Sequence, residues 1–168
     1  PLQIDTSMSR HELDNLRIGC DLIIDIVCGV FEYSKIAADL IIKALKFHSV
    51  KYISCKFSGN KGFHIGVPFQ AFPEKIKNEE TRRLFPYAPK KIALYLREMI
   101  KNPLGEKIMD SENGNFDAII KKTGKKGNEM TYYDNAIKKL NPEPFLNIDT
   151  LLISSRHLYR MPYSLHEK

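Results

Sequence analysis

Apolar residues along the first half of the chain follow strand-like and helix-like spacings in turn. A run rich in β-branched residues at 21–27 (DLIIDIV) predicts a buried strand. Between Tyr33 and Lys46 the apolar residues recur at helical spacing, which predicts an amphipathic helix. Residues 50–57 and 64–69 favour strands again, and the glycine-containing turn SGNKG separates them. The predicted order is strand, helix, strand, turn, strand.

The second half of the chain begins with a helical signal and ends with a β signal. Helical spacing dominates over residues 73–107. Residues 110–128 are rich in glycine, asparagine and lysine, and we predict that the basic run at 121–127 is exposed to solvent; contact with nucleic acid is the less favoured interpretation. A rigid NPEP connector at 141–144 precedes a return to β character over 145–153.

These elements predict one α/β (α+β) domain spanning residues 1–168, with a small mixed or antiparallel sheet and helices packed behind it. The chain starts with Pro1 and not with methionine, so we expect a fragment or a chain from which segments are missing. No apolar run approaches the roughly 18 residues that span a bilayer, and no stretch has the pattern of a secretory signal. We therefore expect a cytoplasmic protein without a membrane partner.

The net charge and the cysteine content indicate the kind of partner and the cellular compartment to expect. The net charge of +6 and a pI near 9.2 favour a polyanionic partner. The cysteines, Cys20, Cys28 and Cys55, are odd in number and lack zinc-ligand spacing, which favours a reducing compartment. Each is most simply interpreted as a small buried apolar residue.

The turn within the stretch FSGNKGFHIGVP concentrates groups that suit an anion. Gly59 and Gly62 allow backbone N–H groups to approach an anion closely. Ser58 offers a hydroxyl, Lys61 a positive charge and His64 an imidazole. A simple glycine turn with an exposed lysine accounts for the same residues equally well, and spacing alone leaves both interpretations open.

A second group of cations lies at the C-terminal end, in the segment RHLYRMPYSLHEK. Pro162 fixes the backbone between Arg160 and Ser164, and so helps to orient their side chains. Arginine offers a bidentate fork for phosphate, and imidazole donates a further hydrogen bond. An exposed basic tail is slightly favoured when this segment is considered by itself.

Two carboxylates lie within apolar strand-like runs, Asp25 in LIIDIV and Asp149 in LNIDTLL. A buried carboxylate is costly unless it is paired or bound to a cation. Two converging carboxylates suit Mg²⁺ or Mn²⁺, although for each residue alone a strand-end role is the better interpretation. Together with the two cationic clusters, they provide the parts that phosphoryl transfer requires.

Three segments in this order resemble the archaeo-eukaryotic primase superfamily, and most closely its archaeal small catalytic subunits. SGNKGFH resembles the SGxxGxH motif, RMPYSLHEK resembles the RxPxSLHxK segment, and LIIDI resembles the strand that carries the first metal carboxylate. The resemblance implies a mixed α/β catalytic core that synthesises primers de novo from nucleoside triphosphates on a DNA template. It also implies a nucleoid-associated enzyme with a large primase subunit or a fused equivalent as partner, and a variable, largely helical insertion at 73–141.

The resemblance also implies roles for individual residues. Asp25 and Asp149 would be the catalytic ligands of Mg²⁺ or Mn²⁺. The incoming triphosphate would be held by Ser58, Gly59, Lys61, His64, Arg160, Ser164, His166 and Lys168.

The sequence departs from the family pattern at Val27. The family carries two aspartates in an Asp-x-Asp arrangement, which places both on one face of a strand, and valine cannot bind a metal ion. The chain is therefore either a weak or inactive member, or one with residues missing between Ile26 and Val27. We favour missing residues, because Cys28 and Gly29 fit the remnant of a cysteine-bearing zinc module.

Two alternative functions follow from these residues. One is the polymerase domain associated with end-joining DNA ligases, which shares the metal and triphosphate chemistry. The other is a non-catalytic nucleotide-binding or nucleic-acid-binding member of the superfamily.

Overall fold

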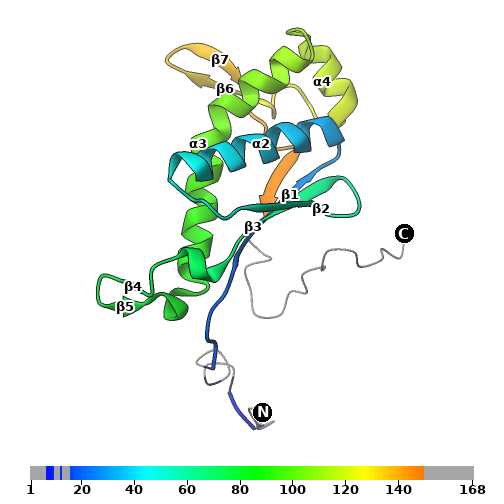
Figure 1. Cartoon of the computed structure of the whole chain (residues 1–168). Helices are drawn as coiled ribbons and strands as arrows, with labels where there is room; N and C mark the ends of the chain where they lie inside the picture. Colours follow the sequence, from blue (N-terminus) through cyan, green and yellow to red (C-terminus); the bar gives the residue numbers. More distant parts are fainter. Residues whose placement is uncertain (1–6, 10–11, 13–15, 150–168) are drawn as a thin grey trace.

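The computed structural model describes residues 7–9, 12 and 16–149 of the chain (Figure 1). The elements, in chain order, are β1 (Leu22–Cys28), α2 (Phe31–Phe47), β2 (Ser54–Phe57), β3 (Gly62–Val67), β4 (Lys75–Ile76), β5 (Glu79–Glu80), α3 (Tyr87–Ser111), α4 (Phe116–Thr123), β6 (Thr131–Asp134), β7 (Ile137–Leu140) and β8 (Leu146–Asp149). Two short 3₁₀ turns, at Phe69–Ala71 and Thr81–Leu84, flank the β4–β5 hairpin.

Four strands form the main sheet, in the order β2-β3-β1-β8, and every neighbouring pair is antiparallel. The strands β4–β5 and β6–β7 form two separate hairpins. This arrangement confirms the predicted mixed α/β class with an antiparallel sheet. No helix among the described residues is long and apolar enough to cross a bilayer.

Strand β1 alternates between the core and the opposite face of the sheet. Leu22, Ile24 and Ile26 are 2%, 0% and 0% exposed and belong to the hydrophobic core. Burying each such side chain stabilises the fold by about 1.5–3 kcal/mol. The alternate positions, which include Asp25, lie on the opposite face. A slip of one residue would bury Asp25 in the core, so the burial pattern fixes the register.

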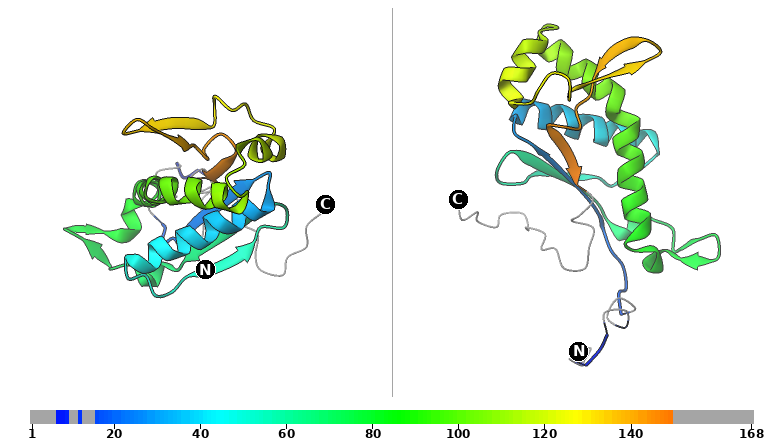
Figure 2. Two further views of the ribbon diagram at one scale, coloured as in Figure 1. Left: turned by 90° about the horizontal axis from the view of Figure 1, so that it is seen from above. Right: turned by 180° about the vertical axis from the view of Figure 1, so that it is seen from behind.

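Helices α2 and α3 pack against each other and cover one face of the sheet (Figures 1 and 2). The buried stripe of α2 consists of Tyr33, Ser34, Ala37, Ala38, Leu40, Ile41, Ala44 and Leu45. Helix α2 ends at Phe47 with His48 as its C-cap, and the next residue, Ser49, adopts a positive φ of 62°. Neither helix covers the opposite face of the sheet, which we call the open face. The candidate site lies on this open face.

A polar network joins α2 and the end of α3 to α4. The Tyr33 hydroxyl donates to Glu112 Oε1 over 2.9 Å, and Lys122 Nζ donates to the same oxygen over 2.6 Å. Burial, followed by the bond to Glu112, raises the pKa of Tyr33 well above its ordinary value. The Lys122 bond lowers the pKa of Glu112. The hydroxyl therefore remains protonated and the carboxyl ionised, which keeps the network intact near neutral pH.

The secondary structure differs from the sequence prediction in two places. The strand predicted from Val50 begins only at Ser54, because the Val50 amide donates to the Leu45 carbonyl and closes the end of α2. Helix α3 begins only at Tyr87, and the β4–β5 hairpin occupies part of the region where a helix was predicted. The lysine-rich segment forms α4, which Asn115 caps by accepting a hydrogen bond from the Ala118 amide. The lysines at 121, 122, 125 and 126 are exposed, as predicted.

Candidate functional site

The open face of the sheet carries a single row of polar positions across all four strands. His64 on β3 lies directly opposite Asp25 on β1, and Lys56 on β2 lies directly opposite His64. On the other side of β1, Asp149 lies directly opposite Asp25. Directly opposite positions share a face of the sheet and lie about 5 Å apart. The pairing thus places these four positions in one row, although they span most of the chain.

Asp25 and His64 are in contact within this row. His64 Nε2 lies 3.2 Å from Asp25 Oδ1, and the two side chains are 10% and 14% exposed, respectively. The contact is within ion-pair distance, but among the described residues Asp25 Oδ1 has no partner with hydrogen-bond geometry. A largely buried carboxylate oxygen without a hydrogen-bond donor is costly and therefore suited to an added cation.

The β2–β3 loop lies at one end of this face, and its glycines have specific structural roles. Gly59 adopts a φ of +98°, and the Ser58 amide donates to the Gly62 carbonyl over 2.9 Å. A Cβ atom built on Gly62 would lie 2.0 Å from the Ile26 carbonyl oxygen. The turn and the close approach of β3 to β1 therefore require these glycines, whatever the loop binds. Lys61 at the tip of the loop is exposed.

Buried and aromatic side chains hold the loop from the helix side. Ser34 is fully buried on α2, and its hydroxyl donates to the Lys61 carbonyl over 2.7 Å. The rings of Phe31, Phe57 and Phe63 pack together at the base of the loop, with centroids 5.5–6.0 Å apart. These supports were not predicted from the sequence. No local pattern indicates them, because they join residues that are distant in the sequence.

Val27 lies on the open face, two residues beyond Asp25, and is 48% exposed. It lies opposite Gly62 on one side and Asn147 on the other. Strand β1 runs without a break through Ile26 and Val27 and keeps one register with each neighbour. Asn147, which is also exposed, provides an amide oxygen beside Val27 on the open face. It was not predicted as a site residue.

The structure does not describe all of the predicted site residues. Arg160, Ser164, His166 and Lys168 lie outside the described residues. For Asp149 the strand register gives its position.

The cysteines are free thiols in different environments: Cys28 is buried, Cys20 is half-buried and Cys55 is exposed. Burial raises the pKa of the Cys28 thiol, which disfavours the thiolate form that binds zinc. Within residues 16–149 and the few described before them, no three His, Cys, Asp or Glu side chains gather as a metal site.

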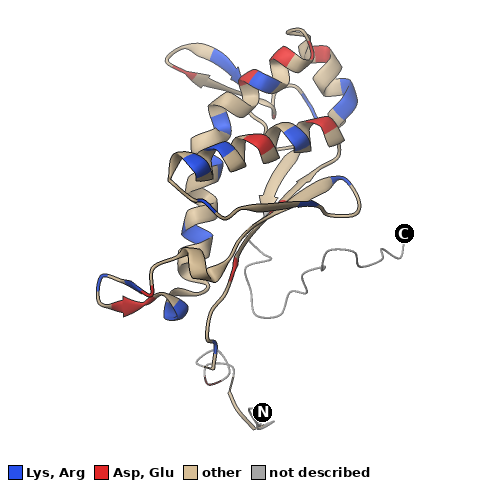
Figure 3. Cartoon of the chain, in the orientation of Figure 1, with Lys and Arg blue, Asp and Glu red and all other residues tan. Residues whose placement is uncertain are grey.

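Lysines lie on either side of the start of α2. Lys61 is on the β2–β3 loop, and Lys121 and Lys122 are on α4, where Lys122 pairs with Glu112 (Figure 3). No protein-family model matches this chain, and neither a curated protein nor a solved structure matches it significantly. Function is therefore inferred from the site itself.

Proposed function

We propose that this chain is the catalytic core of a primase-type, DNA-templated nucleotidyltransferase that starts primers de novo from nucleoside triphosphates. The observation that carries the proposal is the register of β1, which places Asp25 beside His64 on one side and opposite Asp149 on the other. The resemblance assigned these residues to a metal and a triphosphate from three separate segments.

Asp25 and Asp149 would hold Mg²⁺ or Mn²⁺. The donor set fits such an ion, because Asp25 Oδ1 is buried without a hydrogen-bond donor among the described residues and carboxylate oxygens are preferred ligands of hard cations. When bound, the cation would neutralise the phosphates and stabilise the attacking and leaving oxygens. His64 keeps the Asp25 carboxylate in place from the neighbouring strand.

The β2–β3 loop would hold the triphosphate. Gly62 lies opposite Val27, two residues along the strand from Asp25, which corresponds to about 7 Å. Ser58 and Lys61 flank that point, with a hydroxyl and a positive charge. The loop is anchored through its own carbonyl to Ser34, so its geometry is fixed before a ligand arrives. Arg160, Ser164, His166 and Lys168 would complete the phosphate site.

Val27 favours one competing function, a nucleotide-binding module without catalysis. A position two residues from Asp25 on the same face carries an apolar side chain where a second carboxylate would serve two metal ions. A site with fewer carboxylates retains phosphate-binding groups but holds divalent cations more weakly.

Primer synthesis on single-stranded DNA with Mn²⁺ tests the proposal. Asp25→Asn keeps the shape of the side chain and removes its charge, so product formation should fall at least about 100-fold. Asp39→Asn is the matched control, since Asp39 is an exposed carboxylate that pairs with Lys43 on the outside of α2. Equal activity of both variants and the unchanged chain would remove Asp25 from the site.

The same assay separates the candidate functions. De novo products from an unprimed template support a primase. Extension only of paired or gapped ends supports the end-joining type of polymerase. Nucleotide binding without any product supports the binding module.

A further inference from the structure

A cavity of about 480 Å³ lies beside the β6–β7 hairpin, where the hairpin meets the C-terminal half of α3 (Figures 1 and 2). Residues of α3, α4 and both strands of the hairpin line it, and none of them belongs to the main sheet. Its apolar lining includes Met109, Phe116, Ile137 and Leu140. The cavity is therefore separate from the carboxylate row and from the β2–β3 loop.

The cavity reaches one edge of β7. All four residues of the strand, Ile137–Leu140, line it. Successive side chains of a strand point to opposite faces, so a cavity lined by four consecutive residues lies along the edge of the strand and not over one face. Among the described strands β7 pairs only with β6, so its outer edge has no strand partner there.

The turn of the hairpin shows which backbone groups point out from this edge. Asn135 and Ala136 have positive φ values of 48° and 64°, as in a two-residue type I′ turn. A hydrogen-bonded pair, here Asp134 and Ile137, closes such a turn, and pairs without hydrogen bonds then alternate with bonded ones. The next residue of β7, Lys138, therefore directs its backbone N–H and C=O away from β6.

Two contacts agree with this alternation. The Asn141 amide donates to the Met130 carbonyl over 2.8 Å, as a bonded pair in the same phase should. A Cβ atom built on Gly105 would lie 2.7 Å from the Leu140 carbonyl oxygen, so that carbonyl points from β7 toward α3. Lys138 is in the same phase as Leu140, and outside the hairpin its backbone N–H and C=O bond to no residue that the structure describes.

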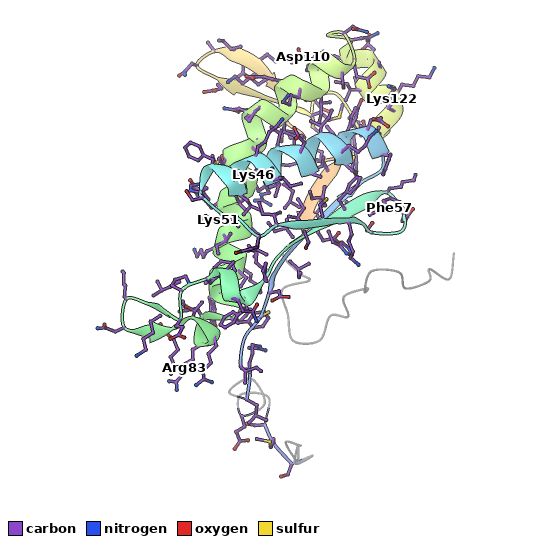
Figure 4. The ribbon with its side chains drawn as sticks, in the orientation of Figure 1. Lys46, Lys51, Phe57, Arg83, Asp110 and Lys122 are labelled. Carbon is purple, nitrogen blue, oxygen red and sulfur yellow. The ribbon has the colours of Figure 1, made fainter. Side chains whose placement is uncertain are left out.

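Two carboxylates line the same cavity. Glu106 and Asp110 lie about one turn apart on α3, and Asp110 is close to the end of that helix (Figure 4). Neither carboxylate forms an ion pair within the described part of the chain. Like charges at this spacing weaken a helix slightly, so the fold gains nothing from the pair.

The lysines that line the cavity already contact other groups. Lys139 Nζ donates to Asp134 Oδ2 over 2.7 Å. That bond is the main cause that raises the pKa of Lys139, and Glu106 contributes least to the rise. Lys138 Nζ lies 5.7 Å from the centroid of the Phe116 ring, in a cation–π contact. The carboxylates on α3 therefore remain available to a cationic group of a ligand.

We propose that an extended segment of a partner protein adds to the outer edge of β7 as a third strand of the hairpin. An apolar side chain of that segment would occupy the cavity, and a neighbouring lysine or arginine would contact Glu106 and Asp110. Strand addition binds through main-chain hydrogen bonds and selects side chains through pockets at alternate positions. A nucleic acid suits this cavity poorly, because the carboxylates repel phosphates. The inference does not rest on the proposed nucleotide chemistry.

The first test exposes the full chain to an arrayed library of short peptides with varied central residues. We expect binding to peptides in which apolar residues occupy every second position and a lysine or arginine lies beside them. Preference for acidic peptides, or no binding across the library, would overturn the proposal.

Methylation of single backbone amides in the best peptide separates strand addition from docking by side chains alone. Each methyl group removes one N–H donor and keeps every side chain. Affinity, measured by fluorescence anisotropy, should fall at least about fivefold when the methylated amide faces β7, and less than about twofold for the amides between. Equal affinities of all the methylated peptides would show that the segment does not add as a strand.

Variants of the hairpin locate the edge that binds. Lys138→Pro removes the outward N–H of β7, and Tyr133→Pro is the matched control, because Tyr133 lies opposite Lys138 and directs its own N–H to the outer edge of β6. Only Lys138→Pro should lose about fivefold or more in affinity. In the unchanged chain, bound peptide should slow amide exchange at Lys138 and not at Tyr133, which tests the edge even if a proline unfolds the hairpin. Protection at Tyr133 alone would overturn the proposal.

Removal of the two carboxylates tests the charge of the partner. Glu106→Gln combined with Asp110→Asn should weaken binding of the best peptide about threefold at low salt and less at high salt. The matched control is Glu98→Gln, which removes an exposed carboxylate of α3 that does not line the cavity. An equal effect of the control, or no effect of the double variant, would overturn the assignment of a basic partner segment.

Discussion

Replacement of Val27 by aspartate tests directly whether the open face holds a divalent cation. Val27 is 48% exposed and shares a face with Asp25, so the new carboxylate would extend into solvent beside the existing one. We expect Val27→Asp to tighten the binding of Mn²⁺ and to raise Mn²⁺-dependent product formation. The change adds a ligand without altering any other residue of the row.

The magnitude follows from charge and exposure. A unit charge about 4 Å from a divalent ion gains about 2 kcal/mol in bulk water, which is roughly a 30-fold gain in affinity. Against this, losing a half-buried valine costs about 1 kcal/mol of folding free energy. Repulsion from Asp25 at about 7 Å adds about 0.6 kcal/mol. The total cost of about 2 kcal/mol is small beside the roughly 5–15 kcal/mol typical of a folded domain.

The assay is a Mn²⁺ titration of primer synthesis, accompanied by thermal unfolding with and without Mn²⁺. Val27→Asn is the matched control, because it has the size and polarity of the aspartate without its charge. Half-maximal activity should shift to about 30-fold lower Mn²⁺ in the aspartate variant alone, and added Mn²⁺ should raise the Tm of this variant more than that of the asparagine variant or the unchanged chain. If the aspartate and asparagine variants respond alike, no cation binds at this level of β1, and the metal-site reasoning is wrong.

Two further predictions concern stability. Gly62→Ala places a Cβ atom 2.0 Å from the Ile26 carbonyl oxygen and should cost about 1–3 kcal/mol in urea unfolding. Gly66→Ala should lower the free energy of unfolding by less, because its new Cβ atom meets the Ser54 hydroxyl, which can rotate away. Equal losses in the two variants would show that the backbone clash at Gly62 is not the cause. Lys122 lowers the pKa of Glu112 in the folded state. The contribution of this ion pair to folding stability is therefore fully present above about pH 4.5, and it is lost as pH falls through the lowered pKa of Glu112. Glu112→Gln should flatten that acid loss, and an unchanged profile would contradict it.

Strand β1 and helix α2 were predictable because each buries one face. The run LIIDIV has one register that keeps Asp25 out of the core, and α2 repeats apolar residues at helical spacing. Helix α4 was also within reach of the sequence. Asn115 and Gly124 are ordinary start and stop residues, and α4 lies within residues 73–141, which were expected to be largely helical.

The site itself was only partly predictable. The four residues 58–61 that link β2 and β3 determine their register, so the pairing of Lys56 with His64 was available from the sequence. The pairing of β8 with β1 was not, because more than 100 residues separate Asp25 from Asp149 and no local pattern encodes that contact. Asn147 follows from the same pairing and was missed for the same reason.

The glycines of the β2–β3 loop are weaker evidence of function than the Asp25–His64 pair on the open face. The turn and the contact with β1 account for Gly59 and Gly62, so the loop would keep both without any ligand. The fold does not require the Asp25–His64 pair in the same way. Replacing a buried ionic pair with apolar residues is often neutral or stabilising, so a fold has no need of a carboxylate beside an imidazole on this sheet. The pair therefore points to a ligand more strongly than the motif that first indicated one.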